Sequence, residues 1–177
     1  MKPFITIISA TNRVPSYSIK IAEYYKLLLE NKGAEVNIID LSNLPPKFIF
    51  SALYDNVGKD EEFNKLISSI SESNKIIFIV PEYNGSFPGV LKAFLDGLSF
   101  PNTLKNKKGA LVGISSGVMA GALALSHLTD ILNYLGMHVL AIKPRLPRID
   151  KLFVEGKIND EFLTKLINAQ IESFLEF

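Results

Sequence analysis

Short apolar runs alternate along the chain with longer segments in which apolar side chains recur every three or four residues. Continuous apolar runs of this length are typical of buried strands, whereas the longer period is typical of amphipathic helices. The predicted strands cover five runs: Phe4 to Ile8, Val36 to Ile39, Ile76 to Val80, Ala110 to Ile114 and Val139 to Ile142. The chain therefore repeats a strand and helix unit.

Helical periodicity follows each of the first four runs and fills the end of the chain. The first helix precedes Gly33, which stands where a helix commonly ends. The other predicted helices lie within Glu61 to Ser73, Val90 to Leu98, Leu125 to Leu135 and Asn159 to Phe177. The segment from Leu41 to Lys59 contains Pro45 and Pro46 and is predicted to be a long irregular connection.

This alternation predicts an α/β fold. Parallel strands need long crossovers, and these crossovers place helices on both faces of the sheet. The first and third runs are the most continuously apolar, while Asn37 interrupts the second, which is typical of an edge strand. We therefore expect a flavodoxin-like three-layer sandwich with a five-stranded parallel sheet of order 2-1-3-4-5, formed by residues 1–177 as a single domain.

Composition narrows the possible functions. The 177 residues are 47% hydrophobic and carry a formal net charge of +1 without a basic stripe, so neither nucleic acid nor a membrane is an expected partner. The first apolar run is too short for a signal segment or a membrane span, because Thr11, Asn12 and Arg13 interrupt it. The chain has no cysteine, which excludes disulfides, thiolate catalysis and sulfur-ligated metals, and is compatible with a cytoplasmic location.

The loops that follow the strands of such a sheet carry its ligand sites. The first loop, SATNRVPSYS, offers the hydroxyls of Ser9, Thr11, Ser16 and Ser18 and the cation of Arg13 in front of a helix N-terminus. Such a cluster suits a phosphate group, although an N-capping cluster with a solvated arginine would use the same residues. The chain has no G-x-G-x-x-G or Walker motif, which argues against a dinucleotide-binding Rossmann fold or a P-loop NTPase.

The second loop, PEYNGSFPG, follows the third strand. Gly85 allows a flat ligand to approach the backbone, Tyr83 and Asn84 can border that ligand, and the two prolines restrict the loop. An ordinary turn with Pro88 near the first helical position is the alternative.

The third loop places Ser115, Ser116 and Gly117 directly after the fourth strand. Downstream, His127 lies among leucines of a predicted helix, so we expect it to pack or to face solvent rather than to act as a general acid. His138 has no Asp or His cluster around it, and no metal site is expected.

These segments together resemble the NADPH-dependent FMN reductase family, flavodoxin-like flavoproteins that include quinone, azo-dye and chromate reductases. The resemblance rests on PEYNGS followed by PGVLK-x-x-x-D, and on Ala10 to Ser18, which matches G-[ST]-x-R-x-x-S-x-[NS] except at its first residue. Ala120 is a second alanine at a usual glycine, and Gly97 stands where the family often has tryptophan.

The resemblance implies FMN as cofactor, with its phosphate in the first loop and its ring beside the second and third loops. The flavin N5 then carries the chemistry, and no side chain is catalytic. Because an acidic group beside a reduced flavin is unfavourable, Glu82 is expected to point away and to contribute its backbone. The implied cofactor-binding residues are Ser9, Thr11, Arg13, Ser16, Tyr17, Ser18, Pro81, Glu82, Tyr83, Asn84, Gly85, Ser115, Ser116 and Gly117.

The implied activity is that of an FMN-dependent oxidoreductase with ping-pong chemistry. NADPH or NADH passes a hydride to FMN, and a flavin, quinone or similar small molecule then accepts the electrons. The resemblance also implies a homodimer or homotetramer in which the partner subunit helps to wall the flavin pocket. A flavodoxin-type one-electron carrier would share the fold and the cofactor, although such carriers are usually strongly acidic. A non-enzymatic binding module on the same fold is the remaining alternative.

Overall fold

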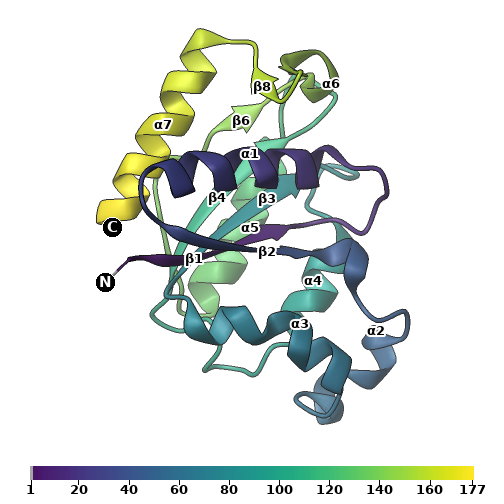
Figure 1. Ribbon diagram of the computed structural model, residues 1–177. Coiled ribbons are helices and arrows are strands. Elements are labelled where there is room, and N and C mark those ends of the chain that lie inside the picture. Colours follow the sequence, from purple (N-terminus) through teal and green to yellow (C-terminus); the bar gives the residue numbers. More distant parts are fainter. Residues whose placement is uncertain (1) are drawn as a thin grey trace.

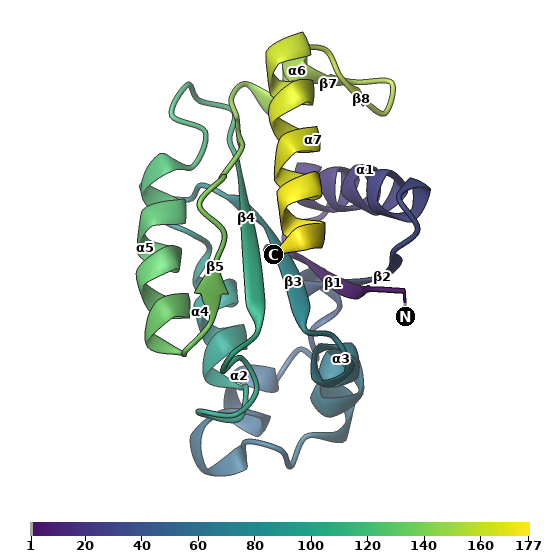
Figure 2. The same ribbon diagram turned by 90° about the vertical axis from the view of Figure 1, so that its left-hand side faces the viewer.

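In the computed structural model, which describes residues 2–177, a parallel sheet lies between two layers of helices (Figures 1 and 2). The strands lie in the order β2-β1-β3-β4-β5, which confirms the predicted flavodoxin-like topology. Their bounds are β1 (Phe4–Ser9), β2 (Glu35–Asp40), β3 (Lys75–Pro81), β4 (Lys108–Ile114) and β5 (His138–Val139).

One face of the sheet is covered by α1 (Tyr17–Asn31) and α7 (Glu161–Glu176). The opposite face is covered by α3 (Glu61–Glu72), α4 (Gly89–Asp96) and α5 (Ala122–Tyr134). Figure 2 shows the two layers on either side of the sheet, with α1 and α7 on one side and α4 and α5 on the other.

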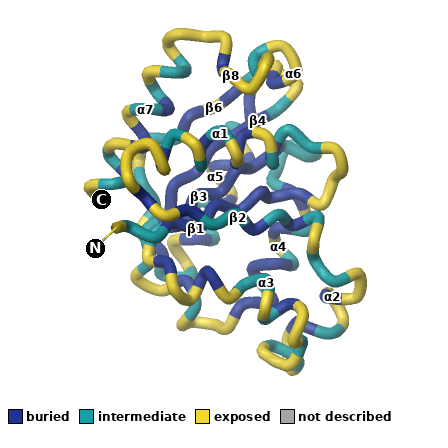
Figure 3. Tube along the Cα trace, in the orientation of Figure 1, coloured by how far each residue is buried: buried dark blue, intermediate teal, exposed yellow. Residues whose placement is uncertain are grey.

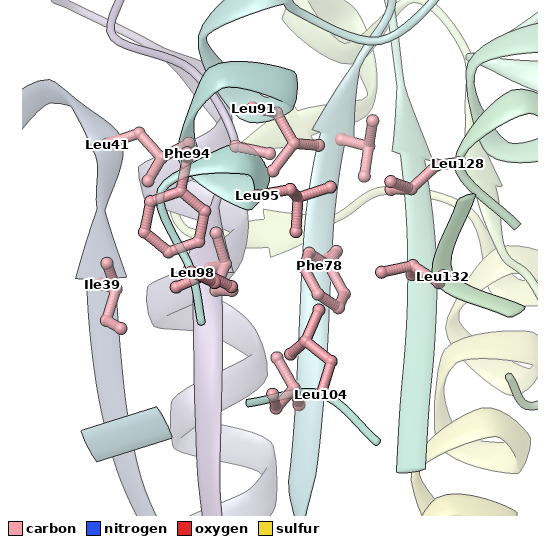
Figure 4. Packing of buried hydrophobic residues seen from close by; sticks show 14 of the residues in the cluster. Ile39, Leu41, Phe78, Leu91, Phe94, Leu95, Leu98, Leu104, Leu128 and Leu132 are labelled. Atoms are coloured by element: carbon pink, nitrogen blue, oxygen red, sulfur yellow. The ribbon is translucent and has the colours of Figure 1, made fainter. Parts of the chain in front are cut away.

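The central strands are buried on both faces, as Figure 3 shows for β1, β3 and β4. Side chains alternate between the two layers, so Ile77 packs toward α1 and α7 while Phe78 packs toward α4 and α5. Figure 4 shows Leu95 of α4 beside Phe78, Phe94 beside Leu41, and Leu128 and Leu132 of α5 on the opposite side of Phe78. Burial on both sides explains why these strands read as continuous apolar runs.

The fifth strand differs from the predicted Val139 to Ile142. Strand β5 stops at Val139, and the chain rejoins β4 only at β6 (Arg145–Leu146). Across the gap, the Gln170 side-chain amide donates to the carbonyls of Leu111 and Ile142, each at 2.9 Å. A side chain of α7 therefore satisfies the carbonyls that strand pairing leaves free.

The connection predicted to be irregular between Leu41 and Lys59 is instead built from short helical turns. These are η1 (Leu41–Asn43), α2 (Phe48–Ser51) and η2 (Tyr54–Asn56). Phe48 is buried and stacks on Phe63 of α3, with ring centroids 5.9 Å apart, so this connection is anchored to the core.

A small hairpin between β6 and α7 was not predicted. It follows α6 (Ile149–Leu152) and consists of β7 (Phe153–Val154) and β8 (Lys157–Ile158). Glu155 and Gly156 form its turn with φ of 49° and 77°. Two positive φ angles are the mark of a type I′ turn, and the glycine was the sequence signal for it.

Candidate functional site

A cavity of about 220 Å³ opens at the carboxyl ends of β1, β3 and β4, where the three predicted loops meet. Its lining includes ten of the predicted site residues: Thr11, Arg13, Ser16, Tyr17, Ser18, Pro81, Glu82, Tyr83, Ser115 and Ser116. Four others lie outside its lining: Ser9, Asn84, Gly85 and Gly117. A wider groove of about 830 Å³ follows β2 and α3 at the sheet edge and contains none of the predicted site residues.

The first loop ends at the N-terminus of α1. Ser16 caps the helix, since its Oγ accepts a hydrogen bond from the Ile19 amide at 3.4 Å. Among the described residues, the buried side-chain polar atoms without a hydrogen-bond partner are the hydroxyls of Ser9 and Ser18. Ser18 lines the cavity, and an unsatisfied buried hydroxyl there is suited to bind a polar ligand. The first-turn amides of a helix are likewise free to bind an anion.

Thr11 joins the first loop to the second. Its Oγ1 accepts a hydrogen bond from the Arg13 amide at 3.2 Å and lies 2.8 Å from the hydroxyl of Tyr83. The Arg13 side chain is exposed and forms no ion pair within residues 2–177. Its charge is therefore available to a ligand at the cavity mouth.

The second loop contains a two-residue turn at Asn84 and Gly85. The amide of Tyr83 donates to the Ser86 carbonyl at 2.8 Å, and the Ser86 amide donates back at 3.0 Å. Asn84 and Gly85 have φ of 51° and 73°, which makes this a type I′ turn, for which Asn-Gly is the favoured pair. A Cβ on Gly85 would meet nothing within 4 Å, so in this structure the backbone angle is what requires glycine.

Glu82 directs its carboxylate to the start of α5. The Gly121 amide donates to Glu82 Oε2 at 2.8 Å, where the partial positive charge of a helix N-terminus stabilises an anion. The backbone of Glu82 continues β3, because its amide donates to the Ile114 carbonyl at 3.1 Å. The charge of Glu82 is thus engaged by the protein itself.

The third loop is closed by the Ser115 side chain, which is bonded to the amide and the carbonyl of Gly117 at 3.1 Å each. The chain then crosses back over β4 at Ala120, which has φ of 50°. A Cβ on Gly113 would lie 2.4 Å from the Ala120 carbonyl oxygen. Glycine in β4 therefore makes room for this crossing.

Sequence reasoning missed Ile114, Ile149 and Pro15, which also line the cavity. Ile149 arrives from the segment after β6, where its amide donates to the Ser115 carbonyl at 3.0 Å. The position of this residue depends on a contact between loops that are far apart in the chain, and no local pattern marks it.

Gly97 is buried, and a Cβ at this position would lie 2.8 Å from the Phe63 ring. The aromatic ring of Phe63 therefore occupies the space next to residue 97. A bulky residue there would require Phe63 to move.

Both histidines are exposed. His127 lies on α5 with its Nδ1 2.9 Å from the Ser86 hydroxyl, whereas His138 lies on β5 at the other end of the sheet. Within residues 2–177, no group of three or more His, Asp or Glu side chains is arranged to hold a metal ion. No helix in the same range is long and apolar enough to span a membrane.

Residues 3–143 match the family model described as "NADPH-dependent FMN reductase". The chain belongs to this family. It is 34% identical to a 2-hydroxy-1,4-benzoquinone reductase of a Burkholderia species over 147 residues, 78% of this chain and 76% of that relative. It is 27% identical to an NAD(P)H-dependent FMN reductase of Pseudomonas aeruginosa over 146 residues, 80% and 77% of the two chains.

Among solved structures, the flavoenzyme NAD(P)H:acceptor oxidoreductase FerB of Paracoccus denitrificans has the same fold. Its TM-score is 0.79 at 24% identity, and the match covers 99% of this chain and 96% of that one. The predicted family, the flavodoxin-like fold and an enzyme that uses FMN and NAD(P)H are confirmed.

Proposed function

We propose that this family member binds FMN in the cavity at the carboxyl ends of β1, β3 and β4 and passes electrons from NAD(P)H to a quinone or a flavin. The observation that carries the proposal is the buried, unpartnered hydroxyl of Ser18 in the cavity lining. It lies in the first turn of α1, close in sequence to the unpaired cation of Arg13. Hydroxyl, helix N-terminus and guanidinium together fit a phosphate dianion.

The flavin ring is proposed to lie between the turn at Tyr83 to Ser86 and the loop at Ser115 to Gly117. Bound FMN would supply the redox chemistry that carries two electrons from the reduced nicotinamide to the acceptor. The residues of this chain hold and orient it. Tyr83 keeps its hydroxyl on Thr11, and Glu82 keeps its carboxylate on the Gly121 amide, so neither is assigned an acid or base role.

An apolar acceptor is supported by the segments that surround the cavity. Val14 lies between the lining residues Arg13 and Pro15, and Val118 and Met119 closely follow the lining residue Ser116; all three are more than half exposed. Exposed apolar side chains beside a cavity favour a flat, apolar molecule. A quinone has this character, and the Burkholderia relative is named for a benzoquinone. The electron donor is either NADH or NADPH.

We further propose that two or four copies assemble around the flavin in the cytoplasm. The cavity of about 220 Å³ in one chain is smaller than the roughly 300–1,000 Å³ typical of sites for molecules of this size. Phe50 and Tyr54, in the connection after β2, are 82% and 79% exposed and are available to a partner subunit. Sedimentation at micromolar concentration tests the assembly, and a monomer with full activity would contradict it.

The phosphate assignment is tested by replacing Arg13 with alanine. A hydrogen bond to a charged group contributes about 1.5–3 kcal/mol, so FMN affinity should fall roughly ten- to a hundredfold. Riboflavin, which lacks the phosphate, should bind almost as before. Arg145→Ala is the matched control, because Arg145 is exposed but lies outside the cavity lining. Equal losses for FMN and riboflavin would show that Arg13 does not bind the phosphate.

A further inference from the structure

The loop after β3 is attached to α5 by a side-chain contact outside the cavity. The Ser86 hydroxyl lies 2.9 Å from Nδ1 of His127, which is 41 positions further along the chain. Neither residue lines the cavity. Ser86 is, however, the residue whose amide and carbonyl close the Asn84–Gly85 turn.

The turn is held by few other contacts. Two backbone hydrogen bonds between Tyr83 and Ser86 close it, and a hairpin of this size is marginally stable by itself. At the start of the turn, the Tyr83 hydroxyl lies 2.8 Å from Thr11 Oγ1. At its end, the Ser86 hydroxyl contacts His127. One side-chain contact therefore holds each end of the turn, and the two partners come from different parts of the fold.

His127 is carried by a helix that is firmly packed. Its neighbour Leu128 is fully buried and Leu125 is 3% exposed, both in the core between α5 and the sheet. The same helix receives the carboxylate of Glu82 at the Gly121 amide. Helix α5 thus contacts the loop after β3 at two points: at Glu82, where the loop begins, and at Ser86, where the turn ends.

We propose that His127 is a positioning residue, which acts through Ser86 to hold the Tyr83–Ser86 turn against the flavin site. This role rests on the proposed function for its consequence in catalysis, but the contact itself exists without the cofactor. A loosened turn shifts the border of the flavin site, and small misplacements of reacting groups cost rate.

The chemistry of the pair defines the variants. The Nδ1 of a neutral imidazole can accept a hydrogen bond from the Ser86 hydroxyl, and an imidazolium can donate one to the hydroxyl oxygen. The contact therefore forms in either protonation state. Asparagine at position 127 places a polar atom near the position of Nδ1 and can keep the hydrogen bond to Ser86. Leucine has no polar side-chain atom and removes this hydrogen bond. His138→Leu is the matched control, because His138 is exposed at the other end of the sheet.

The first measurement is amide hydrogen exchange of Tyr83 and Ser86 in the protein without added flavin. Loss of one hydrogen bond should speed exchange at both amides by about two- to tenfold in Ser86→Ala and in His127→Leu. The double variant should be no faster than either single variant. His127→Asn should return exchange close to that of the starting protein, and His138→Leu should leave it unchanged.

The second measurement is flavin reduction at saturating NAD(P)H in FMN-loaded protein. We expect His127→Leu and Ser86→Ala to lower this rate by a similar factor of about two to ten, with His127→Asn restoring it. Exchange and reduction rates in His127→Leu that equal those of His138→Leu would overturn the positioning role. If the starting protein fails to bind FMN, the proposed function is wrong, while the exchange measurement still decides whether His127 holds the turn.

Discussion

Gln170 of α7 joins three parts of the fold in the interior and is 1% exposed. Its Oε1 accepts a hydrogen bond from the Tyr25 hydroxyl of α1 at 2.9 Å. Its Nε2 donates to the carbonyls of Leu111 in β4 and Ile142, at 2.9 Å each. Gln170→Leu keeps a similar volume and removes all three hydrogen bonds.

The cost follows from the groups that lose their partner. The Tyr25 hydroxyl and the Leu111 carbonyl belong to fully buried residues, whereas Ile142 is partly exposed and its carbonyl can be hydrated. Each unsatisfied buried group costs about 1–3 kcal/mol, so the free energy of unfolding should fall by about 2–6 kcal/mol. For a chain of this length, the melting temperature should fall by about 4–24 °C.

Urea unfolding of Gln170→Leu, Tyr25→Phe and the double variant measures this network. The double variant has no Tyr25 hydroxyl left without a partner. Its loss of unfolding free energy should therefore be smaller than the sum of the two single losses by about 0.5–3 kcal/mol. Asn168→Ala, on the same helix, removes only a hydrogen bond to the Thr164 carbonyl and should change stability by about 0.5 kcal/mol or less. Additive losses, or a loss below about 1 kcal/mol in Gln170→Leu, would refute the reasoning.

Four further predictions concern single positions. Burial raises the pKa of Tyr25 well above its ordinary value, so above about pH 10 the unfolded chain releases this proton while the folded protein keeps it. In unfolding experiments, the stability should therefore fall above about pH 10, by up to about 1.4 kcal/mol per pH unit more than in Tyr25→Phe. Gly85→Ala should cost about 1–2 kcal/mol in urea unfolding and weaken FMN binding, because φ is 73° there; unchanged stability would contradict the assigned turn. Ala120→Gly should gain about 1 kcal/mol, since φ of 50° is unfavourable for alanine, and a loss would count against this explanation. Tyr83→Phe removes the hydroxyl contact to Thr11 that holds the turn, so it should lower the rate of flavin reduction in stopped-flow measurements by no more than about two- to tenfold, whereas a loss of about 10²-fold or more would point to a general acid.

The fold could be predicted largely from the sequence because its central strands are buried on both faces. The run from Phe4 to Ile8 became β1 (Phe4–Ser9), and that from Ile76 to Val80 became β3 (Lys75–Pro81). Burial on both sides removes polar residues from a strand, so the pattern itself marks the element. The helix predicted within Glu61 to Ser73 ends one residue earlier, at Glu72.

The remaining features depend on contacts between distant residues. The break in the fifth strand is stabilised by Gln170, which lies 28 positions after Ile142. The Asn84–Gly85 pair was predicted to border the ligand, and the structure places it in a turn outside the cavity lining. Local sequence does not reveal that Ser86 contacts His127. Periodicity identifies faces and elements, whereas the partner of a polar side chain is set by how those elements pack.

The most direct test of the proposed function is anaerobic rapid mixing of the FMN-loaded protein with NADPH or NADH, followed by mixing with a benzoquinone. The yellow flavin absorbance should bleach within seconds and should return when the quinone is added, with one hydroquinone formed for each nicotinamide oxidised. A protein that does not retain FMN, or whose flavin stays oxidised with both nucleotides, would contradict the proposed function.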